Sequence, residues 1–256
     1  MFLQSLTVVL AVGLAVGSTL QIHPASSETP ASNPVSAELL AQGKAVFDIA
    51  CAPCHGLGGS GNGPLSENFR TRPRDLTKGV YKNRSTASGQ LPTDDDLDDS
   101  ITAGIHSSTM PGYARMSPED RGAVVQYLKT LSPKFLDSTE YPLEVLQPTQ
   151  PIIPSPQSIA RGQAIYLKMQ CDACHGKRGK GDGISADVQH DDFGSFVHTT
   201  DLTKASDFKF AQSAQDVYRI FSAGMNGVPM PSYASTLQDS DRWHLANYVW
   251  SLHSSQ

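Results

Sequence analysis

The sequence predicts an all-α protein made of two tandem copies of one helical unit, joined by a proline-rich linker. The pentapeptides CAPCH (51–55) and CDACH (171–175) are near copies of each other, and together they contain all four cysteines of the chain. The offset of 120 residues between them also relates Met110 to Met230, which indicates a repeated unit. Apolar residues recur at helical spacing within each copy, and no strand pattern of comparable strength is present.

The repeats and the proline content set the expected boundaries. The first copy is expected at 36–132 and the second at 158–256, each near the size of a small domain. The linker, 133–157, has prolines at 133, 142, 148, 151, 154 and 156, which favour extended backbone. Because Leu146, Ile152 and Ile153 would otherwise be left in water, we expect a semi-rigid strap that lies across both copies.

Each copy is expected to contain three main helices. Thr93 and Ser213 are good N-caps for the middle helix, and Gly104 and Gly224 suit its C-terminal end. The helix before each cysteine motif should turn an aromatic residue, Phe47 or Tyr166, toward the core. The expected bounds are 38–50, 93–104 and from 117 in the first copy, and 159–169, 213–224 and from 240 in the second.

The N-terminus has the character of an export segment. The first 22 residues carry no charged side chain, and the apolar run 6–16 is shorter than the roughly 20 residues that span a bilayer. We therefore expect a signal peptide at 1–17, a flexible segment at 18–35 and a periplasmic protein. No Lys or Arg precedes the apolar run, so an uncleaved membrane anchor is the alternative. Membrane association would then arise only through this segment.

Composition narrows the class of protein. A chain of 256 residues with 39% hydrophobic and 18% charged residues is typical of soluble globular proteins. The formal net charge of −5 disfavours nucleic acid as a partner. It is compatible with electrostatic steering toward a basic patch on a redox protein.

The cysteine motifs indicate covalent haem. In Cys-x-x-Cys-His, the two thiols form thioethers with the haem vinyl groups and the histidine becomes an axial ligand of the iron. The alternatives in an exported protein are two disulfides, a redox-active dithiol or a zinc site. The histidine directly after each pair, present twice, favours haem. The residues concerned are Cys51, Cys54 and His55 in the first copy and Cys171, Cys174 and His175 in the second.

Met110 and Met230 are the candidates for the sixth iron ligand. Each lies 55 residues after the histidine of its own motif, in STMPGY and VPMPSY. A methionine is most often core filler. The proline after each one disfavours helical backbone, and the identical spacing in both copies favours the ligand interpretation.

On these motifs the sequence resembles a diheme cytochrome c built from two class I (His/Met) cytochrome c domains. The resemblance covers essentially everything after the export segment and includes the glycine-rich segments 56–64 and 176–184. It implies two all-helical domains, each holding one covalent haem c. It also implies that Pro64 offers its carbonyl oxygen to the haem histidine, whereas Ile184 stands at that position in the second copy.

The expected function is that of an electron carrier without catalytic residues. With His on one side of the iron and Met on the other, neither site is open, and the sulfur stabilises ferrous iron. The chain would transfer single electrons between a donor and an acceptor protein, alone or as the electron-transfer subunit of a larger oxidoreductase or respiratory chain. The alternatives are a diheme peroxidase, in which one haem lacks its sixth ligand, and a disulfide-stapled binding protein.

Other polar residues have less specific interpretations. His106 could replace Met110, but its counterpart is Asn226, which favours a surface role. The second copy carries an insertion, 190–198, with His190 and His198; it is interpreted as an ordinary surface loop, with partner docking or a metal or ligand site as alternatives. The segment 70–84 has six basic residues, of which one or two arginines are expected to bind haem propionates.

Overall fold

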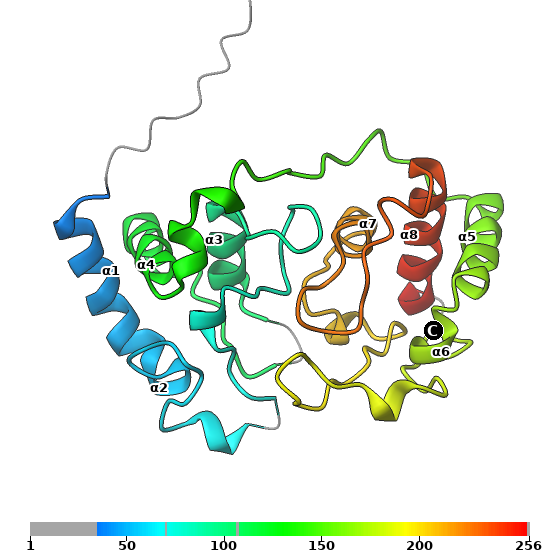
Figure 1. Cartoon of the computed structure of the whole chain (residues 1–256). Helices are drawn as coiled ribbons and strands as arrows, with labels where there is room; N and C mark the ends of the chain where they lie inside the picture. The colour runs from blue at the N-terminus through cyan, green and yellow to red at the C-terminus, as the bar shows by residue number, and fades with distance from the viewer. Residues whose placement is uncertain (1–34, 70, 106–107, 255–256) are drawn as a thin grey trace, which may run out of the picture. The chain divides into compact units, whose positions relative to one another are not determined.

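The computed structural model describes residues 35–69, 71–105 and 108–254 (Figure 1). The predicted export segment lies outside them, as does His106. No helix of the described part combines the length and the apolar character that crossing a membrane requires. The described residues form helices and short 3-10 turns without a strand, as the all-α prediction requires. The helices are α1 (Ala37–Ala50), α2 (Ala52–His55), α3 (Asp94–Ala103), α4 (Pro118–Thr130), α5 (Pro156–Lys168), α6 (Asp172–His175), α7 (Ala214–Ala223) and α8 (Asp239–Ser254).

The expected caps begin and end the helices. Thr93 and Asp96 form a reciprocal capping box at the start of α3, and the Ser213 side chain accepts a hydrogen bond from Asp216 N at the start of α7. Gly104 and Gly224 follow these two helices with φ of 70° each, a conformation that favours glycine. The middle helix is therefore specified locally, at the same positions in both copies.

Glycines set the close approach of the first and last helices in each copy. A Cβ at Gly43 of α1 would lie 2.1 Å from the carbonyl oxygen of Ala123 in α4. A Cβ at Gly162 of α5 would lie 2.0 Å from that of His244 in α8. Because neither crossing has room for a methyl group, the two backbones are in direct contact. Figure 1 shows α5 beside α8.

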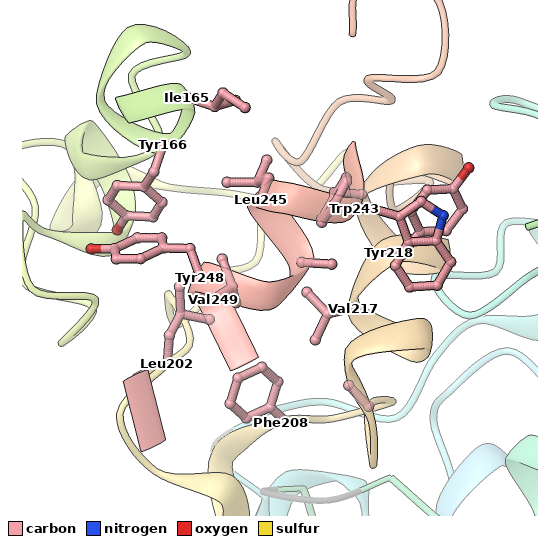
Figure 2. Packing of buried hydrophobic residues seen from close by; sticks show 13 residues of the cluster. Ile165, Tyr166, Leu202, Phe208, Val217, Tyr218, Trp243, Leu245, Tyr248 and Val249 are labelled. Carbon is pink, nitrogen blue, oxygen red and sulfur yellow. The ribbon is translucent and has the colours of Figure 1, made fainter. Parts of the chain in front are cut away.

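Each copy has its own apolar core. Phe47 and Tyr166 are 0% and 1% exposed, which confirms that the aromatic residue of the first helix faces inward. In the second core, shown in Figure 2, the rings of Tyr218 and Trp243 stack with centroids 4.4 Å apart. The tandem all-helical architecture predicted from the repeat is confirmed.

The linker contacts both copies. Leu146 N donates to Ser85 O in the first copy, and Asn247 Nδ2 of α8 donates to Ile152 O. Leu146 and Ile152 are half-buried, as the strap prediction requires. Ile153 is 82% exposed, so the expectation that it is covered was wrong. Its neighbour Ile152 supplies the apolar contact instead, since it packs against the second core.

One buried arginine joins the two copies. The Arg84 side chain, 2% exposed, donates from Nη1 to Gly224 O at 3.0 Å and from Nη2 to Ala223 O at 2.6 Å. Asn226 also donates from Nδ2 to Gln90 O at 3.1 Å. These bonds attach the segment before α3 to the C-terminal end of α7.

Candidate functional site

The cysteine motifs form one-turn helices at equivalent places. α2 and α6 follow α1 and α5 directly, and neither cysteine pair is joined as a disulfide. Burial is the main cause that raises the pKa of both Cys51 and Cys171 to about 11. Both sulfurs therefore lie in surroundings that disfavour charge, and neither pair forms the disulfide considered from the sequence.

The glycine-rich segment after each motif folds back under it. Gly61 N donates to His55 O, and Gly181 N donates to His175 O, both at 2.8 Å. Gly56 and Gly176 have φ of 78°, which allows the chain to reverse directly after the histidine. The motif and its loop thus form one hydrogen-bonded unit, built in the same way in each copy.

The orientation of each histidine is set by a backbone carbonyl. His55 Nδ1 lies 2.9 Å from Arg74 O, and His175 Nδ1 lies 3.2 Å from Thr200 O. A carbonyl oxygen can only accept, so Nδ1 carries the proton and Nε2 keeps the lone pair that can bind a metal. Burial lowers the pKa of both histidines, which also favours the neutral ring.

The expectation that Pro64 supplies this carbonyl was wrong. Leu76 N donates to Gly59 O at 2.7 Å, which brings Arg74 O to the histidine. In the second copy, Leu202 N donates to Gly179 O at 2.6 Å and places Thr200 in the same way. The difference at position 184 therefore has no effect on this hydrogen bond.

A repeated turn holds these carbonyls in place. Asp75 Oδ1 accepts from the backbone N–H and the hydroxyl of Thr77, and Asp201 Oδ1 accepts from those of Thr203. Sequence reasoning did not identify Arg74 and Thr200 as acceptors. The signal was present, because DLTK occurs at 75–78 and again at 201–204, directly after them.

Met110 and Met230 line the same cavity as the motif of their own copy. Ile105 N donates to Met110 O, and Met225 N donates to Met230 O, so equivalent turns present the two residues. Met225 also lines the second cavity, where its counterpart is Ile105. The structure thus brings each predicted methionine together with its Cys-x-x-Cys-His motif.

The two cavities are similar in size and lining. They measure about 1340 Å³ in the first copy and about 1280 Å³ in the second, out to their mouths, and apolar side chains dominate their walls. Arg74 lines the first cavity, and its buried Nη1 has no hydrogen-bond partner in the described protein. A flat, largely apolar cofactor with anionic groups at its edge, such as haem, fits these residues.

The insertion packs against the first copy. The guanidinium of Arg74 in the first copy lies 5.5 Å from the ring centroid of Phe193, while Asp192 N donates to Gly227 O within the second copy. His190 and His198 contact the ring of Phe196 edge-on. No group of three metal-ligating His, Cys, Asp or Glu residues occurs in the described ranges, so nothing there supports the metal interpretation.

Two cavities, each presenting a pair of thiols and an Nδ1-bonded histidine on a helical scaffold, define a class of protein that binds haem covalently. The family model for cytochrome c matches residues 40–132 and 159–253. The chain therefore belongs to the cytochrome c family. It consists of two tandem cytochrome c domains, and it binds covalent haem c through both Cys-x-x-Cys-His motifs.

One solved relative extends this assignment. A chain of the Kuenenia stuttgartiensis reducing HAO-like protein complex is 43% identical, with a TM-score of 0.78. The similarity covers 82% of this chain and 95% of that one. No curated protein matches the sequence. The fold and the sites together support a haem protein that transfers electrons.

Proposed function

We propose that this chain is a periplasmic diheme cytochrome that transfers single electrons as a subunit of a larger oxidoreductase. The similar solved chain belongs to a multi-subunit complex, which supports a partner that is itself a redox protein. The acidic net charge of −5 favours a docking surface on that partner that is rich in Lys and Arg. Electrons would enter through one domain and leave through the other.

We assign Met110 and Met230 as the sixth ligands opposite His55 and His175. Haem c with His and Met ligands supplies reversible one-electron chemistry with a raised reduction potential. The chain's part is to present Nε2 of the histidine and the thioether sulfur of the methionine, which are positioned by the repeated turns described above. With both positions filled, outside molecules have no access to the iron.

The observation that carries this proposal is the equivalence of the two sites. Both copies have the same kind of histidine-to-carbonyl hydrogen bond, and in both a backbone N–H five residues earlier donates to the carbonyl oxygen of the methionine. A peroxidase requires one site that differs, because its working haem needs an open position. The matched geometry therefore favours a carrier over the peroxidase.

Replacement of each methionine tests the ligand assignment. In Met110→Ala or Met230→Ala holoprotein, we expect the sulfur-to-ferric charge-transfer band to fall by about half and one reduction potential to drop. Met116→Leu is the control, because Met116 is half-buried but lines neither cavity. An unchanged spectrum in either alanine variant would refute the assignment. Rapid peroxide turnover by the unaltered protein would favour the peroxidase.

Native purification tests the assembly and the location. We expect the chain to co-elute with a second redox protein in the periplasmic fraction, with a mature N-terminus near residue 18. Elution as a free chain would contradict the subunit role. Recovery with membranes and an intact N-terminus would show an anchored protein instead.

A further inference from the structure

The two haem cavities share part of one wall. Lys82, Lys209 and Phe210 line both cavities. Lys82 lies seven residues after Asp75, and Lys209 lies eight residues after Asp201, so each copy contributes one lysine from the same segment. The junction is thus built symmetrically from the two repeats.

This shared wall is rich in positive charge. Burial, and next the charges of Arg74 and Lys209, lower the pKa of Lys82 to about 8. Asp191 is the acid that opposes this effect. Burial also lowers the pKa of Lys209, which shares a polar cleft with Asp201 and Asp207. Cations held near one another and partly out of water need an anionic partner to offset the cost of desolvation.

The haem carboxylates are anions of the required kind. Haem carries two propionates. The lysines and arginines that line the cavities are Lys82 and Lys209 in both, and Arg72 and Arg74 in the first only. Arg74 contributes a buried Nη1 without a hydrogen-bond partner on the first side of the junction. The shared lysines can therefore meet carboxylates from either cavity.

We propose that Lys82 and Lys209 form a cationic bridge common to both haem sites, which raises the reduction potentials of the two centres together. This inference rests on the proposed function, since it requires two one-electron centres. A positive charge close to a haem favours its reduced form, which carries one positive charge fewer. Because both lysines face both cavities, each charge acts on the two centres at once.

Single neutralisations in the holoprotein test the bridge. In Lys82→Gln and in Lys209→Gln, we expect both reduction potentials to fall, measured at pH 7 by redox titration with haem-methyl NMR signals that report each centre separately. Lys82→Arg keeps the charge and should preserve both potentials. Arg72→Gln is the control, because Arg72 lines the first cavity only; at most one potential should fall.

The results separate the bridge from the proposed function. If each lysine variant shifts only one potential, or neither, while the sulfur-to-ferric band is intact, the bridge is refuted and the carrier function stands. If the unaltered protein does not titrate in two one-electron steps, the proposed function itself fails. A purely structural role for the lysines would lower stability without moving both potentials in parallel.

Discussion

Arg84 of the first domain donates a 2.6 Å hydrogen bond to the carbonyl oxygen of Ala223 in the second. Ala223 is the last residue of α7, where carbonyl groups without helical partners carry partial negative charge. Gly224, the other acceptor, begins the turn that leads to Met230. The contact between the domains therefore lies at the base of the loop that presents a proposed iron ligand.

Loss of this side chain should destabilise the holoprotein. Arg84→Met leaves two buried carbonyls without donors, so we expect the free energy of unfolding to fall by about 1–3 kcal/mol. Chemical denaturation monitored by haem absorbance measures this free energy. Arg161→Ala removes an exposed ion pair with Asp241 and should change stability by less than about 1 kcal/mol. Equal stability of the two variants would contradict the importance of the Arg84 contact.

The aspartates of the repeated DLTK turns should tune one centre each. Asp75→Ala removes the turn that holds Arg74 O against His55 Nδ1. A weaker hydrogen bond makes the imidazole a poorer donor to ferric iron, so we expect a higher reduction potential at the first haem. Asp201→Ala should act on the second haem alone. Redox titration measures the two potentials separately. A shift at the second haem in Asp75→Ala, or at the first haem in Asp201→Ala, would count against this role.

Adding a single methyl group at a helix crossing should destabilise the protein. In Gly43→Ala or Gly162→Ala, the new Cβ meets a backbone carbonyl, so stability should fall by about 1–3 kcal/mol. Gly122 of α4 is exposed and has open space around it, so Gly122→Ala should stabilise by about 0.5–1 kcal/mol. Thermal unfolding compares the three variants. A destabilised Gly122→Ala variant would show that the crossings are not the cause.

Tyr218 should contribute to the loss of stability at alkaline pH. Burial, and next its hydrogen bond to Asp239, raise its pKa to about 12, above the ordinary 10.0. The folded state thus keeps a proton that the unfolded state loses, and this stabilisation is complete below pH 10.0 and disappears toward about 12. Tyr218→Phe should be less stable by about 1 kcal/mol at pH 7 and fall less steeply above pH 10 in denaturation series. An identical alkaline slope would contradict this.

The local features of the fold were predictable because the sequence determines them at short range. The capping box of Thr93 and the glycine after α3 satisfy backbone groups within one helical turn, so their signals are visible in the chain itself. The cysteine motifs and methionine turns were predictable for a related reason. They occur twice with the same spacing, and the structure brings each pair into one cavity.

The parts that were missed depend on contacts between distant segments. The acceptor for His55 lies 19 residues away, and its position follows from the bond between Leu76 and Gly59. Arg84 reaches Gly224 across 140 residues. Nothing near Arg84 in the sequence distinguishes it from the other basic residues of 70–84. Such partners follow from how the two copies pack, which the repeat alone does not determine.

The linker, hydrogen-bonded along both domains, keeps them at a high effective concentration with respect to each other. For a short tether this concentration is on the order of millimolar, so a weak domain interface suffices to stay closed. Evolutionary selection on the residues of the domain interface can then act on the relative orientation of the domains more than on their affinity for each other. Proteolytic cleavage between 133 and 155 would remove the tether. The two domains would then be separate molecules that dissociate on dilution.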